Sequence, residues 1–154
     1  MSKSHLNFGF REKLNDIMGG NHHNYCYQCG SCVAVCPSAR YSEEFNPREI
    51  LLRTLMGDEE YLIGPDSVIW KCTNCYSCYE RCPQDVRPVE VIIALKNYCE
   101  QQGVAPPLVD KFSETVAKTG RSVMVTSAVN RKRKELGLEE IKDLPVDELE
   151  KILE

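Results

Sequence analysis

The sequence lacks any long hydrophobic segment. No run of about 18 apolar residues occurs, so we expect no transmembrane helix. The opening residues MSKSHLNFGF contain no apolar signal core, which favours a cytoplasmic location. The formal net charge is −4, which gives no general attraction to nucleic acid or to an anionic membrane. The chain also lacks a G-x-G-x-x-G fingerprint for a dinucleotide, and it shows no Ser/His/Asp or Cys/His pattern typical of nucleophilic catalysis. These absences argue against membrane, nucleic-acid and nucleotide-binding functions, and against bond-making chemistry on this chain alone.

Cysteine, in contrast, is abundant, with nine residues in a chain of 154. In a reducing compartment such a number indicates metal binding rather than disulfides. Eight of the cysteines form two runs of identical spacing, C-x2-C-x2-C-x3-C-P. The first run is Cys26, Cys29, Cys32 and Cys36, followed by Pro37. The second run is Cys72, Cys75, Cys78 and Cys82, followed by Pro83. The runs are therefore an internal repeat in which residue 26 corresponds to residue 72.

This spacing is the one that bacterial-type proteins use to ligate [4Fe–4S] clusters. Three cysteines at two-residue gaps can wrap a short loop around three corners of a cubane, while the fourth lies past the loop and ligates the other cluster. We therefore assign the first cluster to Cys26, Cys29, Cys32 and Cys82. We assign the second cluster to Cys72, Cys75, Cys78 and Cys36. The sequence thus predicts two [4Fe–4S] clusters and a function in electron transfer.

Other uses of the cysteines explain the pattern less well. Disulfides would leave one of the nine cysteines unpaired and would not require a repeated spacing. Structural zinc sites use C-x2-C pairs separated by wide gaps, and they need neither the third cysteine nor the following proline. Cys99, the ninth cysteine, shares a predicted helix face with Ile92 and Leu95. We interpret it as a small buried hydrophobe rather than a ligand.

Several polar residues near the runs or in the tail are further candidate site residues. His22 and His23 precede the first run, whereas a Rieske-type site would have histidines within the motif, so we expect a solvated loop here. The basic run 131–134 is interpreted as a solvated helix face, with contact to an acidic partner as the alternative. Ser31 and Ser77 lie inside the cysteine loops, where N–H and hydroxyl groups can hydrogen-bond to cluster sulfurs.

The segments around the runs are predicted to be helical. Asn46 is a suitable N-cap, Pro47 suits the first helical position and Gly57 suits the left-handed end, which predicts a helix over 47–56. Similar signals predict a helix around residues 10–18 and another between Pro88 and Gly103. Helices therefore bracket both cysteine loops, and the sequence predicts an all-α architecture.

The last part of the chain contains no cysteine, and Pro106-Pro107 marks a joint before it. We expect three short helices there, of which one ends at Gly120, one covers 128–136 and one starts at Pro145. The predicted organisation is an N-terminal helix and lead-in loop (1–24), a two-cluster helical domain (25–103) and a C-terminal helical extension (104–154). We expect the extension to wrap around the cluster domain or to bind a partner.

The residues between and around the cysteines of the two runs resemble those of a known family. The segments Tyr25–Tyr41 and Trp70–Pro83 contain CYQCGSC and CTNCYSCYERCP. They resemble the small iron–sulfur subunit of heterodisulfide reductase, its C subunit, and the similarity runs from about Phe8 to Gly103. This resemblance implies a helical-ferredoxin fold. It also implies that the eight cysteines of the two runs match the family's cluster ligands.

The resemblance implies a function as well. In that family, the small iron–sulfur subunit passes single electrons from the A subunit, which holds flavin and clusters, to the B subunit. The latter holds noncubane clusters and reduces the mixed disulfide of coenzyme M and coenzyme B in methanogenesis. The present chain has no adjacent Cys-Cys pair of the kind found in the noncubane-cluster motifs, so it would be a non-catalytic subunit of the oxidoreductase. The resemblance leaves room for a hydrogenase or a formate dehydrogenase in the larger assembly.

Other electron-transfer functions stay open. The chain could be a free diffusible ferredoxin, although a minimal carrier would not need the long cysteine-free extension. It could also be the relay subunit of a sulfur-oxidising paralogue or of another oxidoreductase. A succinate dehydrogenase-like relay would normally bring a [2Fe–2S] domain with C-x4-C-x2-C spacing, which this sequence lacks. A cluster-based transcription sensor would need a DNA-reading or dimerisation element, and none is evident.

Overall fold

The computed structural model describes residues 6–18, 22–142, 144–146, 148 and 151. The described residues form helices and irregular segments with no strand among them, which confirms the predicted all-α class. No described helix is both long and apolar enough to cross a bilayer. The chain divides into two compact units, unit 1 at residues 1–105 and unit 2 at residues 106–154.

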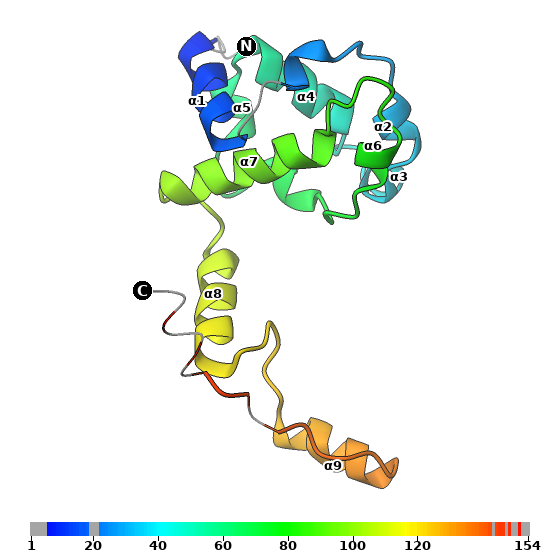
Figure 1. Ribbon diagram of the computed structural model, residues 1–154, viewed down its shortest axis with the longest axis vertical. Helices are drawn as coiled ribbons and strands as arrows, with labels where there is room; N and C mark the ends of the chain where they lie inside the picture. The colour runs from blue at the N-terminus through cyan, green and yellow to red at the C-terminus, as the bar shows by residue number, and fades with distance from the viewer. Residues whose placement is uncertain (1–5, 19–21, 143, 147, 149–150, 152–154) are drawn as a thin grey trace. The chain divides into compact units, whose positions relative to one another are not determined.

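Unit 1 consists of short helices around one long helix (Figure 1). Its elements are α1 (Phe8–Met18), η1 (His22–Tyr25), α2 (Ser31–Ala34), α3 (Pro37–Tyr41), α4 (Pro47–Met56), α5 (Glu59–Leu62), η2 (Val68–Lys71), α6 (Ser77–Glu80) and α7 (Pro88–Gln101). The short helices α2, α3 and α6 gather near the N-terminal end of α7. The cysteine loops precede α2 and α6, so this end of unit 1 carries both loops.

Helix α4 forms where its sequence signals predict it. The Asn46 side chain accepts hydrogen bonds from the backbone N–H groups of Arg48 (3.0 Å) and Glu49 (3.2 Å), which caps the helix. Gly57 ends the helix in the left-handed conformation, with φ at 74°. The side chain of Glu49 does not complete a capping box, because it accepts a hydrogen bond from Arg53 (2.8 Å) instead.

Helix α7 is the centre of the core of unit 1. It packs against α1, α4, α6 and η2. Its side chains Val91, Ile92, Leu95 and Cys99 are at most 1% exposed. Burying an aliphatic side chain of this size stabilises the fold by roughly 1.5–3 kcal/mol. The core position of Cys99 confirms its interpretation as a packing residue.

The start of α1 is tied to α5 and α7. Phe10 packs edge-on against the ring of Tyr98, with 5.3 Å between the ring centroids. The Tyr98 hydroxyl donates a hydrogen bond to Glu59 (2.8 Å), and the Asn7 amide donates to the other oxygen of the same carboxylate (2.8 Å). The N-terminal helix is therefore part of the same core as the helices that surround the cysteine loops.

The expectation of a solvated loop at His22 and His23 is wrong for His23. This side chain is 0% exposed, because η1 packs against α4 and turns it into the interior. The side chain of His22 lies outside the described part of the structure. Sequence patterns do not show this burial, since the two residues stand between Gly19-Gly20 and the polar cysteine loop.

Unit 2 contains α8 (Pro107–Thr119) and α9 (Ser127–Glu135), within one residue of the predicted ends at Gly120 and Leu136. None of its described residues is buried. The basic run 131–134 lies on α9 and is largely exposed, which confirms its interpretation as a solvated face. The helix predicted from Pro145 falls mostly on residues outside the described part of the chain.

Candidate cluster-binding sites

The two cysteine loops fold alike. In each loop the backbone turns left-handed at the same two repeat positions. These are Gln28 (φ 57°) and Gly30 (φ 83°) in the first loop, and Asn74 (φ 52°) and Tyr76 (φ 62°) in the second. A short helix follows directly in each case, α2 after the first loop and α6 after the second. The repeated spacing therefore corresponds to a repeated backbone conformation that wraps each loop tightly.

The first hollow combines cysteines from both loops. It has a volume of about 340 Å³ counted to its open mouth. Its cysteines are Cys26, Cys29, Cys32 and Cys82. Three of them come from the first loop, and the fourth comes from the end of the second run.

The second hollow repeats this arrangement with the loops exchanged. Its volume is about 300 Å³, again counted to its mouth. Its cysteines are Cys36, Cys72, Cys75 and Cys78. The two hollows therefore bring together the same two sets of four cysteines that the spacing predicts.

The remaining walls of the hollows follow the same two-fold pattern. The first hollow is lined by Arg48 and Leu51 of α4 and by Val86 and Pro88. The second hollow is lined by Val89 and Ile92 of α7 and by Phe45 and Pro47. The two helices can be aligned at their first residues, Pro47 and Pro88. In this alignment Leu51 corresponds to Ile92, and Arg48 corresponds to Val89. Each helix thus supplies the apolar wall of one hollow, and its N-terminal proline supplies part of the other.

Corresponding cysteines in the two loops have the same exposure to solvent. Cys32 and Cys78 are buried, and burial raises the pKa of both thiols to about 11. Cys29 and Cys75 are exposed. A serine hydroxyl lies beside each exposed sulfur, at 3.3 Å for Ser31 and 3.5 Å for Ser77, and lowers the pKa of that thiol. The hydroxyls of Ser31 and Ser77 therefore contact cysteine sulfurs of their own loops.

Several N–H groups are directed at the other sulfurs. The backbone N–H of Ala39 donates to Cys36 (3.5 Å), and that of Val86 donates to Cys82 (3.3 Å). The Gln28 side chain donates to the sulfur of Cys26 (3.4 Å). N–H donors around the cysteine sulfurs are one of the features by which a protein tunes an iron–sulfur cluster.

Lys96 of α7 forms hydrogen bonds with the second cysteine loop. Its ammonium donates hydrogen bonds to the backbone carbonyl of Cys72 (3.0 Å) and to the side-chain oxygen of Asn74 (3.2 Å). Burial raises the pKa of Cys72, and the positive charge of Lys96 acts in the opposite direction. Lys96 thus holds the second loop against the core helix.

The donor chemistry of the hollows fits iron–sulfur clusters. Among the described residues, no three His, Cys, Asp or Glu side chains are arranged around a single metal ion. A tetrahedral zinc ion would hold thiolates roughly 3.8 Å apart, as follows from Zn–S bonds of about 2.3 Å. A cubane carries its thiolates on four separate iron corners and so needs a wider cage. Each hollow offers four thiols from two loops, which is the number of ligands that a cubane takes.

Some wall residues were not singled out from the sequence. Arg48, Leu51 and Val86 line the first hollow although they stand far from the first cysteine run in sequence. A sequence signal for these wall residues does exist: α4 and α7 both begin with a proline. Residues at equal distances after the two prolines line corresponding walls of the two hollows. The exchange of walls between hollows is a tertiary feature, which the cysteine spacing alone does not show.

The fold and these hollows define a helical ferredoxin-type iron–sulfur protein. Residues 22–86 match the family model described as a 4Fe-4S dicluster domain. With relatives at 33–39% identity, the resemblance seen in the sequence is confirmed. The chain belongs to the family of heterodisulfide reductase C subunits, which are parts of an oxidoreductase.

Three of these relatives illustrate the similarity. The C subunit of the H(2):CoB-CoM heterodisulfide,ferredoxin reductase of Methanothermobacter thermautotrophicus is 35% identical over 90% of this chain and 74% of its own length. The C subunit of the ferredoxin:CoB-CoM heterodisulfide reductase of Methanosarcina mazei is 33% identical over 75% of this chain and 70% of its own. The iron–sulfur C 2 subunit of the CoB–CoM heterodisulfide reductase of Methanocaldococcus jannaschii is 39% identical over 73% of this chain but only 59% of its own.

Proposed function

We propose that this protein is the electron-relay subunit of a heterodisulfide reductase complex. In this proposal it passes single electrons from the flavin- and iron–sulfur-containing A subunit to the noncubane-cluster B subunit, which reduces the coenzyme M–coenzyme B heterodisulfide. The observation that carries the proposal is the pair of hollows, each lined by four cysteines from two loops. The choice of complex is supported by the relatives, which are subunits of CoB–CoM heterodisulfide reductases.

The proposed cofactors are two [4Fe–4S] clusters with crossed ligands. Cys26, Cys29, Cys32 and Cys82 would hold the first cluster. Cys72, Cys75, Cys78 and Cys36 would hold the second cluster. Each cluster, when bound, supplies a one-electron couple. The crossing would also link the two loops, because each cluster joins residues from both runs.

The residues around each hollow would shield the bound cluster from water on most sides and leave one side accessible. Leu51 and Val86 at the first hollow, and Phe45 and Ile92 at the second, present apolar surface that limits the access of water. The exposed thiols Cys29 and Cys75 mark the open side of each hollow. One open side per site suits a relay that meets one partner at each cluster.

The partners and location belong to the same proposal. The flavoprotein and the noncubane-cluster protein are the proposed donor and acceptor, and a hydrogenase or a formate dehydrogenase would be a further component of a larger assembly. The extension 104–154, beyond the helical segment 1–24 and the cluster domain 25–103, is proposed to contact a partner. A cytoplasmic location fits ligand cysteines, which must stay reduced to bind iron.

The test is an anaerobic pull-down of the full chain from its native cells, with iron and sulfide analysis and mass spectrometry of the bound proteins. We expect bound iron and sulfide, a flavoprotein and a protein with Cys-Cys-containing motifs. Bound zinc without sulfide would contradict the cofactor assignment. Recovery of the cluster-loaded chain alone would contradict its assignment to a complex.

A freely diffusing ferredoxin is the second candidate. It is favoured by one observation: both hollows and the buried core lie entirely within unit 1. A small electron carrier needs cluster sites and a core that supports them, and unit 1 contains both. The same pull-down separates the two functions, because a carrier would be recovered without lasting partners.

A further inference from the structure

The two hollows match closely except for one charged side chain. Arg48 lines the first hollow, whereas no Lys, Arg, Asp or Glu among the described residues lines the second. The residue that corresponds to Arg48 at the second hollow is Val89, which is 1% exposed. Among the described residues that line the two hollows, the pseudo-two-fold arrangement is therefore broken in charge at the position of Arg48.

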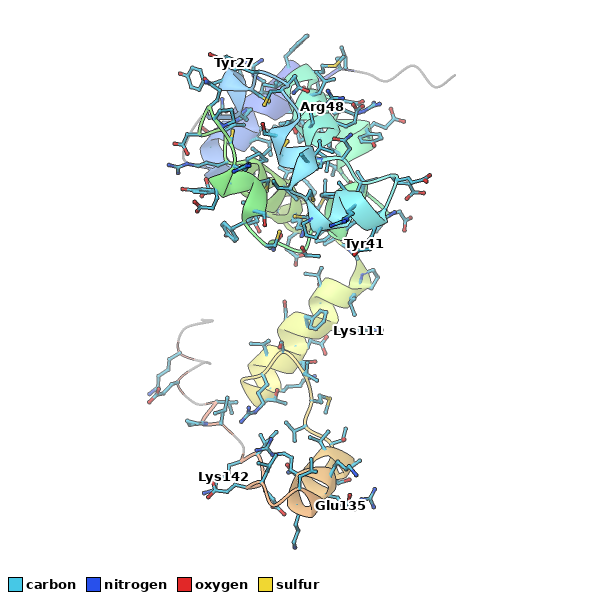
Figure 2. All side chains as sticks on the ribbon, turned by 90° about the vertical axis from the view of Figure 1, so that its right-hand side faces the viewer. Tyr27, Tyr41, Arg48, Lys111, Glu135 and Lys142 are labelled. Atoms are coloured by element: carbon cyan, nitrogen blue, oxygen red, sulfur yellow. The ribbon has the colours of Figure 1, made fainter. Side chains whose placement is uncertain are left out.

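The charge of Arg48 is not neutralised by a neighbour in the described chain. Arg48 is exposed near the start of α4, and none of the described carboxylates forms an ion pair with it. Arg53 on the same helix is different, because it pairs with Glu49 (2.8 Å) and Asp58 (2.5 Å). Figure 2 shows Arg48 on the same part of unit 1 as Tyr27, another residue of the first hollow.

We propose that Arg48 raises the reduction potential of the first cluster selectively. The inference rests on the proposed ligand sets. Reduction adds one negative charge to a cluster, and a nearby unpaired cation stabilises the reduced form more than the oxidised form. Salt screens charges beyond roughly 8–10 Å, so a cation on the wall of one hollow acts mainly on that hollow.

Other groups near the two sites do not reproduce this effect. Gln28 donates a neutral hydrogen bond to Cys26, and it adds to the effect of Arg48 without supplying charge. Lys96 is the cation beside the second loop, but it does not line the hollow. Its ammonium is engaged by the carbonyl of Cys72 and by Asn74. Arg48 is therefore the cation that lines a hollow, and that hollow is the first.

The experiment is an anaerobic redox titration of the full chain loaded with iron and sulfide, followed by EPR. Hyperfine-shifted NMR signals of the cysteine β-protons assign each potential to a cluster. We expect Arg48→Gln to make reduction of the first cluster about tenfold less favourable, which corresponds to about 59 mV for a one-electron couple. The second cluster should change by less than about threefold, because the charge lies on the other hollow.

Three variants make the result specific to charge at position 48. Arg48→Lys keeps the charge and should keep the first potential within about threefold of the unchanged protein. Arg48→Met is a second neutral variant that retains an apolar stem, and it should behave like Arg48→Gln. Arg11→Gln removes one positive charge from α1, away from both hollows, and should leave both potentials nearly unchanged.

The outcomes separate this inference from the proposed function. Two clusters with unchanged potentials in both neutral variants would overturn the role of Arg48 alone. Equal shifts of both clusters, or a shift in Arg48→Lys as large as in Arg48→Gln, would overturn it as well. Loss of the first cluster from both neutral variants but not from Arg48→Lys would make the residue structural and overturn its role in setting the potential. An unchanged chain that takes up no iron and sulfide would instead contradict the proposed function.

Discussion

At the scale of single residues, the fourth cysteine of each run links the two sites. Cys36 caps α3 at the end of the first run, yet it lines the second hollow. Cys82 ends the second run and lines the first hollow. Both sulfurs accept a backbone N–H from a residue further along the chain, Ala39 of α3 for Cys36 and Val86 for Cys82. The position of one side chain therefore decides which site it completes.

Replacing the fourth cysteines tests the crossing. We expect Cys36→Ala to damage the second cluster and Cys82→Ala to damage the first, because each removes one of the four proposed thiolates. In EPR spectra of the reduced proteins, Cys36→Ala should resemble Cys75→Ala, and Cys82→Ala should resemble Cys29→Ala. The opposite pairing of spectra would show that each run holds its own cluster.

The ninth cysteine provides a matched comparison. Cys99 is 0% exposed in the core and lines neither hollow. Cys99→Ala should keep the iron and sulfide content of the unchanged protein, while the small cavity lowers the free energy of unfolding by about 1 kcal/mol. Iron analysis and anaerobic denaturation measure the two effects. A halved iron content would contradict the packing role of Cys99.

At the scale of elements, glycines end both α4 and α7, but their surroundings differ. Gly57 and Gly103 are left-handed, with φ of 74° and 66°. A Cβ at Gly57 would overlap the carbonyl oxygen of Asn7, whereas a Cβ at Gly103 would meet open space. The backbone N–H of Asn7 also donates to the carbonyl of Gly57 (2.8 Å). The end of α4 is therefore the place where the N-terminal segment docks.

Alanine at these two glycines should separate conformational strain from close packing. We expect Gly103→Ala to destabilise unit 1 by about 1–2 kcal/mol through the left-handed backbone alone. Gly57→Ala should cost roughly 1–3 kcal/mol more, because the segment at Asn7 must move. Denaturation of the cluster-loaded variants under anaerobic conditions measures both. Equal losses would mean that the contact between Asn7 and Gly57 adds no stability.

At the scale of the whole molecule, the two units differ in how they bury their side chains. All buried residues of the described chain belong to unit 1. In unit 2 the described apolar side chains remain partly or fully exposed, and Leu108, Val123, Met124 and Leu136 are at least 60% exposed. Cluster binding therefore draws its structural support from unit 1.

A shortened chain that ends at Ala105 tests this division. Because both hollows and the whole buried core of the described residues lie before that point, we expect it to bind as much iron and sulfide as the full chain. Anaerobic reconstitution of the two chains side by side, with iron, sulfide and EPR analysis, measures the result. Loss of either cluster from the shortened chain would show that the extension supports the sites.

Much of this architecture is readable in the sequence because its determinants are local. The cap at Asn46, the prolines that open α4 and α7, and the glycine at 57 act within one helical turn. The repeated cysteine spacing is likewise local, and it predicts both loops and the two four-cysteine sets. The short helices α5 and η2 were not predicted, because four-residue segments contain too few residues to show a period.

Burial and the pairing of walls depend on contacts between distant residues. His23 looks like a loop residue in the sequence, but the packing of η1 on α4 buries it. Arg48 looks like an ordinary charge in the first turn of a helix, but the fold places it on the wall of the first hollow, where its counterpart is Val89. The cysteine spacing was enough to identify the class of protein and to predict which four cysteines line each hollow, because spacing controls which thiols one loop can present. The other side chains around each set of thiols follow from the fold alone, because the packing of α4 and α7 brings those neighbours together.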